Sequence, residues 1–242
     1  MARVAEESVG AAVGNEKRVA VAFSGGLDSS IVAKCAAGRA EVVACTAHSN
    51  GAGDQARARE AASALGLELV VTELTKENVA EALRRIDLPF VPTLMDKSLW
   101  CLYSIVAKSA SEAGTRVILL GQLADELFGG YAKYGEAMKK SGSDAASSMM
   151  EADVREYAHR GRVRDVAACI RWVEPRLPFE AKGMVDLAMR IPMEFKIRDG
   201  VRKAVLRKAA AILRVPAAQA EAGKKAAQYS SGVQKLVAGS PF

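Results

Sequence analysis

Short apolar runs alternate with longer segments of mixed polarity along the first half of the chain. Val, Ala, Ile and Leu dominate four runs, at residues 17–23, 41–48, 67–74 and 116–121. Runs of this length and composition predict buried β-strands. The segments between them have helical spacing, and they cover residues 28–38, 54–65, 76–86 and 98–113. This alternation predicts an α/β fold with a doubly wound parallel sheet covered on both faces.

The pattern changes after residue 140. We expect residues 141–150, SGSDAASSMM, to be the most flexible segment, because Ser, Gly and Met fill it. Beyond it, segments 151–171, 181–191 and 200–214 have helical spacing, and no run predicts a strand. We therefore expect an α/β core at residues 1–140, followed by a helical C-terminal subdomain at residues 141–242.

Composition narrows the class of protein. Half of the 242 residues are apolar and 26% are charged, which excludes a disordered or low-complexity chain. No apolar run reaches the roughly 18 residues of a membrane span, and the start MARVAEESVG lacks a signal pattern, so we expect a cytoplasmic protein without a membrane partner. The four cysteines are widely spaced, which argues against zinc, iron–sulfur and disulfide frameworks.

Charge is distributed unevenly along the chain. The net charge is +6, with a balance of −2 over residues 1–150 (16 Lys/Arg, 18 Asp/Glu) and +8 over residues 151–242 (18 against 10). A basic C-terminal part favours partners that carry phosphate, nucleic acid included. Aromatic residues make up only 5% of the chain, which makes a dedicated single-strand binder less consistent with the sequence.

A serine–glycine turn follows the first predicted strand. Residues 24–30, SGGLDSS, open the first predicted helix, and the two glycines let backbone N–H groups approach an anion there. A carboxylate beside phosphate, here Asp28, requires an intervening Mg²⁺. Neither the Walker loop nor the GxGxxG fingerprint is present. The stretch resembles the pyrophosphate loop of the ATP pyrophosphatase (PP-loop) superfamily, whose members have an adenine nucleotide alpha hydrolase-like fold and cleave ATP to AMP and pyrophosphate.

A second motif, GQLADELFGGY at residues 121–131, follows the fourth predicted strand. Loops at the carboxyl ends of parallel strands line one crevice, so Asp125 can face the same phosphates as Asp28. The motif resembles the ADELFGGY signature of the synthetase domain of class B asparagine synthetases and β-lactam synthetases. Residues 173–179, VEPRLPF, and residues 224–233 resemble two further family segments, so the resemblance spans about residues 17–235.

The resemblance implies an ATP-dependent synthetase that adenylates a small-molecule carboxylate and transfers the acyl group to ammonia or an amine. It implies ATP and Mg²⁺ as cofactors, with Asp28 and Asp125 as metal ligands. The catalytic residues would be Asp125, Lys225 (or Lys224) beside the α-phosphate, and Glu174, which with Arg176 falls at the family's substrate pocket, although an ion pair explains those two equally well. The remaining nucleotide contacts that it implies are Ala22, Phe23, Ser24, Gly25, Gly26, Leu27, Ser29, Ala47 and Gly121.

Three positions depart from the family pattern. Glutamine-hydrolysing members expose a cysteine after the initiator methionine, whereas Ala2 stands here, so we expect ammonia or amine from solution or from a separate glutaminase partner. Gln122 stands where relatives have glutamate or tyrosine, and an amide cannot accept a proton at neutral pH. Glu180 changes the position of a carboxylate beside the pocket. These departures put asparagine itself in question as the product, but not the ATP chemistry.

Two other classes of function stay open. An enzyme of the same superfamily that modifies a tRNA base would use the basic C-terminal part to bind phosphates, and salt-dependent tRNA binding would reveal it. A nucleotide-binding module without chemistry is the third class, and the presence of Asp28, Asp125 and Lys225 argues against it. His48 and His159 lie outside the motifs, and we interpret them as surface or loop residues.

Overall fold

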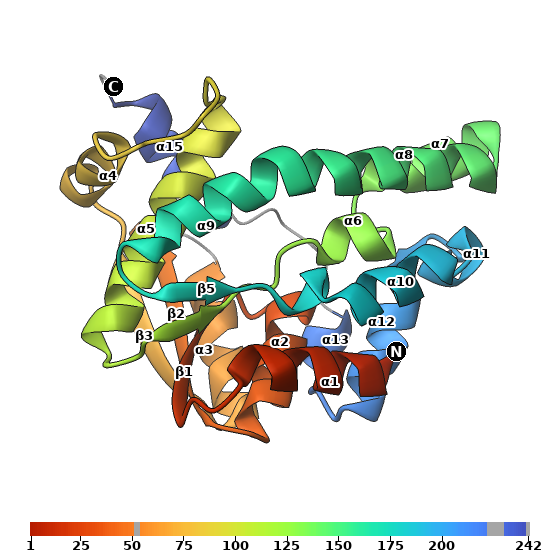
Figure 1. Cartoon of the computed structure of the whole chain (residues 1–242), viewed down its shortest axis with the longest axis horizontal. Helices are drawn as coiled ribbons and strands as arrows, with labels where there is room; N and C mark the ends of the chain where they lie inside the picture. Colours follow the sequence, from red (N-terminus) through yellow and green to blue (C-terminus); the bar gives the residue numbers. More distant parts are fainter. Residues whose placement is uncertain (51–53, 222–229, 241–242) are drawn as a thin grey trace.

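A parallel five-stranded sheet forms the centre of the molecule (Figure 1). The computed structural model describes residues 1–50, 54–221 and 230–240. The strand order is β3-β2-β1-β4-β5, and every neighbouring pair is parallel. The predicted doubly wound α/β fold is confirmed. The strands are β1 (Arg18–Ala22), β2 (Glu41–His48), β3 (Glu68–Glu73), β4 (Val117–Leu119) and β5 (Glu174–Arg176).

Helices cover both faces of the sheet, and the strands divide their side chains between two cores. Val19 and Val21 of β1 enter one core, whereas Ala20 enters the other, as the alternation of a strand requires. The first core contains α1 (Ala2–Val13), α2 (Leu27–Ala37), α3 (Asp54–Leu65), α10 (Lys182–Arg190), α12 (Ala204–Ile212) and α13 (Ala217–Glu221). The second contains α4 (Lys76–Leu83), α5 (Leu94–Glu112), α9 (Arg162–Ile170) and α15 (Val233–Ala238).

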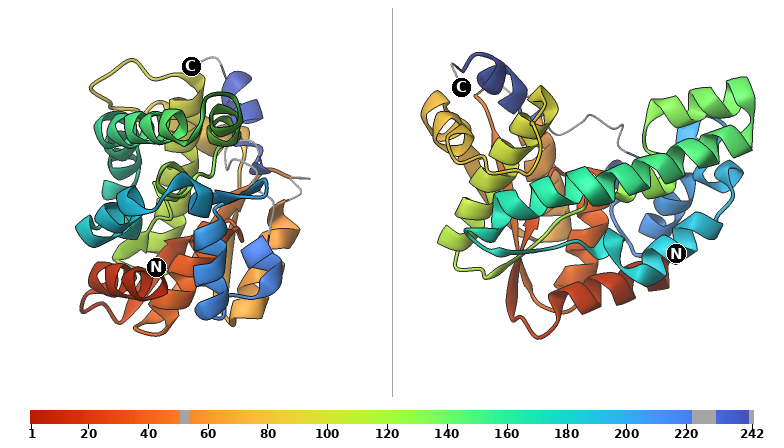
Figure 2. Two further views of the ribbon diagram at one scale, coloured as in Figure 1. Left: turned by 90° about the vertical axis from the view of Figure 1, so that its right-hand side faces the viewer. Right: turned by 45° about the horizontal axis from the view of Figure 1, so that its top comes forward.

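A helical hairpin projects from one end of this body, as the right-hand view of Figure 2 shows. It comprises α7 (Ala132–Ser141) and α8 (Ser143–Glu156), and it follows the short helix α6 (Ala124–Phe128). Residues 141–150 are therefore mostly helical, and the expected flexible segment is wrong. Ala146 and Met150 are buried against Tyr134 and Met193, so apolar packing fixes a segment whose composition alone suggests a loop.

The C-terminal part also contains strands, contrary to the expectation. β5 joins the central sheet as an edge strand, where its proline is tolerated because only one side must bond. Its sequence, Glu-Pro-Arg, has no apolar pattern that could reveal a strand. A small antiparallel pair, β6 (Ile197–Arg198) and β7 (Val201–Arg202), follows the short helix α11 (Met193–Lys196).

Two smaller features position the site. The helix predicted at residues 98–113 starts at Leu94, because Thr93 and Asp96 form a capping box at its start. A π-helical segment, η1 (Tyr157–Gly161), joins α8 to α9, so the two run on as one long helix (Figure 1). A 3₁₀ turn, η2 (Pro178–Glu180), follows β5. None of the helices in the described ranges is both long and apolar enough to cross a bilayer.

Candidate active site

A cavity of about 730 Å³ opens at the carboxyl ends of β1, β2 and β4. β1 and β4 are neighbours at the point where the strand order reverses, which is where ligands bind in open α/β sheets. The volume lies within the range of small-molecule sites. The walls come from the loops after these strands, from α5, from the η1 region and from the start of α12.

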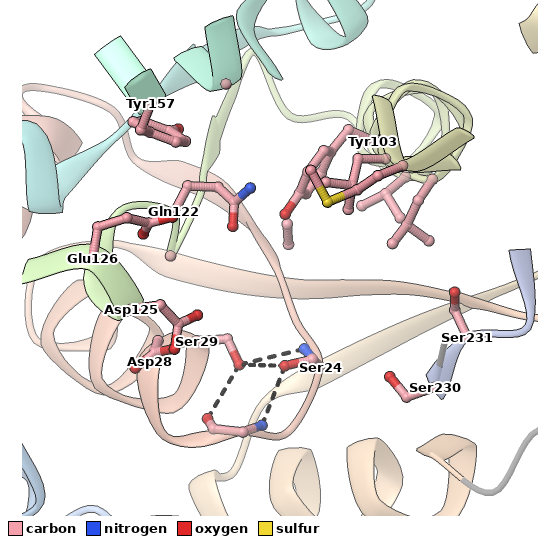
Figure 3. Close-up of a pocket in the computed structure, with 18 of the residues that line it drawn as sticks. Ser24, Asp28, Ser29, Tyr103, Gln122, Asp125, Glu126, Tyr157, Ser230 and Ser231 are labelled. Carbon is pink, nitrogen blue, oxygen red and sulfur yellow. Dashed lines mark hydrogen bonds between the residues drawn. The ribbon is translucent and has the colours of Figure 1, made fainter. Parts of the chain in front are cut away.

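The serine–glycine turn forms one wall, and its hydroxyl groups hold its own backbone in place (Figure 3). The Ser24 backbone N–H donates to Ser29 Oγ at 3.3 Å, and the Gly26 N–H donates to Ser24 Oγ at 3.3 Å. Ser29 Oγ donates in turn to the Gly26 carbonyl at 3.2 Å. Among the described residues, no side chain caps α2, which begins here, and the start of a helix favours an anion.

Gly25 is required for this turn by its backbone and by its neighbour. Its φ of 69° is a left-handed conformation, and a Cβ there would lie 2.8 Å from the Arg57 carbonyl oxygen. The first turn of α3 thus packs directly on the glycine. Arg57 Nε donates to the Ser24 carbonyl at 3.3 Å, and the residue lines the cavity. A guanidinium therefore lies beside the predicted anion site.

The carboxylates of Asp28 and Asp125 converge on one cation. Lys203 Nζ lies 2.5 Å from Asp28 Oδ2 and 2.8 Å from Asp125 Oδ1. Burial by itself would lower the pKa of Lys203, but the two carboxylates outweigh it and raise the pKa above its ordinary value. The lysine is thus charged and locked between the two motifs.

The backbone is strained on two sides of this ion cluster. Leu123, directly before α6, has φ 73°, and Lys203, directly before α12, has φ 57°. Non-glycine residues hold such angles only where the surroundings enforce them, and they gather at functional sites. The residue beside this cluster, Gly130, must lack a side chain. A Cβ there would lie 1.8 Å from Asp125 Oδ1 and 2.5 Å from Lys203 Cε.

The donor set fits a magnesium ion. Two carboxylates from neighbouring loops already share one cation, the ammonium group of Lys203. This group occupies the position between them that a metal ion would take. Among the described residues, no group of three or more His, Cys, Asp or Glu side chains could hold a metal. Mg²⁺ commonly binds through one or two carboxylates and completes its shell with substrate phosphates and water.

A buried ionic network forms the opposite wall. Asp96 accepts from Arg160 Nη2 at 2.6 Å and from Arg164 Nη1 at 3.0 Å. Burial would raise the pKa of Asp96, but hydrogen bonds from Arg160, Thr93 and Arg164 lower it to about 2. Arg164 also donates through Nε to Asp165 Oδ1 at 2.8 Å. The network fixes α9 and η1 against the start of α5.

Part of the remaining wall is apolar. Leu99, Leu102 and Val106 of α5 face the cavity from one helix, near the ends of β1 and β2. His48, at the end of β2, lines the same region and is buried, with its Nε2 2.8 Å from Thr46 Oγ1. The expectation that His48 is a surface or loop residue is wrong.

The structure brings most of the predicted site residues together. The cavity wall includes Ala22, Phe23, Ser24, Gly26, Leu27, Asp28, Ser29, Ala47, Gly121 and Asp125, and Gly25 lies in the same turn. Lys224 and Lys225 lie outside the described residues. Glu174 does not line the cavity: it is exposed on β5, where Arg176 Nε donates to it at 2.8 Å. Glu174 is therefore not part of the proposed site.

Sequence reasoning missed the residues that act through tertiary contacts. Lys203 stands in VRKAVLRKAA, one lysine among several, and no spacing sets it apart. Arg57 occupies an ordinary helix position. Asp165, Arg164 and Tyr157 fall in an unremarkable basic segment. Their positions near the cavity become evident only from the three-dimensional fold.

The parallel sheet and the SGGLDSS turn after β1 define a member of the ATP pyrophosphatase superfamily. The chain belongs to the asparagine synthase family, whose model matches residues 1–172 and 138–239. It is 29% identical to a putative glutamine-hydrolysing asparagine synthetase of Methanocaldococcus jannaschii, over 91% of this chain and 47% of that protein. It is 30% identical to an asparagine synthetase of Arabidopsis thaliana, over 73% of this chain and 32% of that protein.

The chain thus spans about half the length, or less, of the curated relatives it matches. Among solved structures, a U34-tRNA thiolase, NcsA, from Methanococcus maripaludis is similar over 99% of this chain and 80% of that one. The TM-score is 0.42 and the sequence identity 16%.

Proposed function

We propose that this chain binds ATP in the cavity, adenylates a carboxylate and transfers the acyl group to ammonia or an amine. The observation that carries the proposal is the convergence of Asp28 and Asp125 on one cation beside the serine–glycine turn. An anion-binding turn with two carboxylates and a buried lysine suits a triphosphate with its metal. Family membership supports the same chemistry.

The turn and its neighbours would bind the leaving pyrophosphate. The backbone at the start of α2 would supply uncharged N–H donors, and Arg57 would add a positive charge. Lys203 would exchange its contact with the carboxylates for a phosphate oxygen. Once ATP and its metal are bound, donors held in these positions would stabilise the charge that develops on the departing pyrophosphate.

Asp28 and Asp125 would hold Mg²⁺, which neutralises charge on the departing pyrophosphate when it is bound. Adenine would lie against the ends of β1 and β2, beside Ala22, Phe23 and Ala47. The aliphatic side chains of α5 give that region the apolar surface that a base requires. Lys225 stays our expectation for the α-phosphate contact, as the family resemblance implies.

The carboxylate substrate would lie between the ion cluster and the network around Asp96. Gln122 is positioned there, and an amide accepts a hydrogen bond but not a proton. The attacking amine must therefore arrive neutral or lose its proton to another group. We expect L-aspartate with millimolar ammonium to yield little asparagine at neutral pH, and the yield to rise with pH.

Pyrophosphate release tests the proposal. Purified protein with Mg²⁺ and ATP is offered a panel of carboxylates, each with ammonium or a simple amine, and bulk tRNA separately. Asp28→Asn and Asp125→Asn should each lower the rate about 100-fold or more, because each removes a charged ligand. Asp87→Asn, at an exposed position outside the cavity, is the control. Near-normal rates in either cavity variant would contradict the proposed metal site.

The cysteines bear on the tRNA alternative. Burial raises the pKa of Cys35, Cys45 and Cys101 to about 12, and it also raises the pKa of Cys169. Of the four, only Cys45 lines the cavity. Thiols of this kind are not ionised at neutral pH, so they do not supply the reactive thiolates of sulfur transfer. We therefore favour amide formation over a thiolation reaction.

A further inference from the structure

Gln122 is held by a buried carboxylate that no sequence motif indicates. Its Nε2 donates to Asp165 Oδ2 at 2.8 Å. Asp165 is fully buried and does not line the cavity, whereas Gln122 does. The contact therefore reaches from the cavity wall into the interior of the helical layer.

The partner decides which end of the amide faces the cavity. An ionised carboxylate only accepts hydrogen bonds, so Gln122 must present its NH₂ group to Asp165. Its carbonyl oxygen is then left to face the cavity. In Figure 3 the Gln122 amide extends into the cavity with its oxygen on the side of Ser24 and Ser29.

Asp165 is itself fixed from three directions. Arg164 Nε donates to Oδ1 at 2.8 Å, and the Tyr157 hydroxyl donates to Oδ2 at 3.1 Å, the atom that also receives Gln122. Two buried carboxylates, Asp96 and Asp165, face two guanidinium groups, those of Arg160 and Arg164. The charges balance only while position 122 is neutral.

We propose that Asp165 is a positioning residue, which holds the Gln122 amide so that its oxygen accepts a hydrogen bond from the N–H of the attacking amine. The role of the amine in this inference rests on the proposed function. The orientation of the Gln122 amide rests on the geometry alone. Gln122 would bind and orient the nitrogen nucleophile without taking its proton. The site is thus built for a neutral acceptor, where relatives with glutamate would have a base.

The same geometry opposes a carboxylate at position 122. A glutamate in place of Gln122 would bring its oxygen next to Asp165 Oδ2, and two carboxylates at hydrogen-bond distance cannot both ionise. Among the described residues, the charged or titratable groups that line the cavity with Gln122 or interact with Asp165 include Asp28, Tyr103, Asp125, Glu126, Tyr157, Arg164, Glu180 and Lys203. The two cations in this set, Arg164 and Lys203, are already paired with carboxylates. Combining Gln122→Glu with Asp165→Asn exchanges the charge between the two positions and restores both the balance and the hydrogen bond.

Thermal unfolding of four proteins at pH 8, without ligands, tests the orientation: the unaltered chain, Gln122→Glu, Asp165→Asn and the double variant. Gln122→Glu should lower the unfolding midpoint by roughly 5 °C or more. The double variant should regain most of that loss. Its unfolding midpoint should lie above the value expected from adding the two single changes. Gln55→Glu, on partly exposed α3, controls for the added charge. Additive effects, or a harmless Gln122→Glu, would overturn the proposal.

A measurement on the unaltered protein covers the case in which the Asp165→Asn variants do not fold. The side-chain NH₂ resonances of Gln122, assigned by their loss in Gln122→Met, should exchange with solvent at least about tenfold more slowly than those of Gln55. Exchange at the rate of an exposed amide would contradict the contact with Asp165.

A kinetic measurement tests the proposed role of Gln122 in binding the attacking amine. In Asp165→Asn the new NH₂ group would face Gln122, because Arg164 retains the oxygen, so the Gln122 amide should flip and the cavity loses its acceptor. With ammonium as the amine, KM for ammonium should rise about tenfold, while pyrophosphate release in the first half-reaction stays within a factor of about three. Parallel loss in both steps would indicate a merely structural role. If no carboxylate supports pyrophosphate release, the proposed function fails, whereas the unfolding cycle still decides the orientation.

Discussion

At the scale of single residues, Lys203 is the side chain on which the proposed nucleotide site depends. It bridges the carboxylates of Asp28 and Asp125, which belong to two loops far apart in sequence, and it occupies a strained backbone conformation to do so. Removing one member of such a buried ion cluster leaves the others unpaired, which typically costs about 3–5 kcal/mol. A divalent cation can take its place.

Lys203→Met should therefore lower stability without ligands and increase the response to Mg²⁺. We expect millimolar Mg²⁺ to raise the unfolding midpoint of this variant by several degrees, and that of the unaltered protein by much less. Differential scanning fluorimetry measures both. Lys133→Met, which removes another cavity lysine that pairs with Asp153, is the matched control. An equal response to Mg²⁺ in both proteins would mean that Asp28 and Asp125 do not form a cation site.

Arg57 offers a second test at this scale, with inorganic pyrophosphate as the probe. Its guanidinium lies beside the serine–glycine turn, so Arg57→Ala should weaken pyrophosphate binding in the presence of Mg²⁺ about 5–20-fold. Isothermal titration calorimetry gives the affinity. Arg59→Ala, exposed on the same helix, should leave it unchanged. If both variants lost the same pyrophosphate affinity, Arg57 would act only through the overall charge of the protein and not through a direct contact.

At the scale of elements, the buried network joins the start of α5 to η1 and α9, and it makes their packing sensitive to acid. The pKa of Asp96 is about 2, below its ordinary value, so the ionised form is favoured in the folded state. The resulting stability, roughly 2 kcal/mol, is fully present above about pH 4 and is lost as the pH falls toward about 2.

Asp96→Asn checks this contribution by the difference between two proteins. The variant should be less stable at neutral pH by about 3–5 kcal/mol, because Arg160 loses its carboxylate partner and Arg164 loses one of its two. The difference should narrow by roughly 2 kcal/mol between about pH 4 and pH 2 in urea unfolding. A difference that stays constant through this range would show that Asp96 does not titrate with a lowered pKa.

The elements also show where sequence reasoning succeeds. Strands β1 to β3 and the helices between them match their predicted positions within a few residues, because each has a continuous apolar run or stripe of its own. β5 could not be predicted, since it is three residues long and gains its place by pairing with β4. The same holds for residues 143–150, which are helical because Ala146 and Met150 pack against residues of α7 and α11.

At the scale of the whole molecule, the site assembles residues from both halves of the chain. Asp28 and Asp125 come from motifs that are legible in the sequence, and the order of a doubly wound sheet predicts their meeting. The C-terminal half contributes Lys203 and Arg164, which line the same cavity, and Asp165, which contacts the lining residue Gln122. These contacts depend on how α9 and α12 cross the sheet. Such contacts have no spacing rule, so the motifs indicate the ATP chemistry but not the residues that orient the amine.

The proposed chemistry requires that the protein cleave ATP between its α- and β-phosphates. The most direct measurement is ³¹P NMR of the spent nucleotide, after incubation with Mg²⁺, ATP and the carboxylate and amine that best support pyrophosphate release. We expect AMP and pyrophosphate in equal amounts, formed together with the amide, and neither product in Asp28→Asn. ADP and inorganic phosphate as the main products would contradict it.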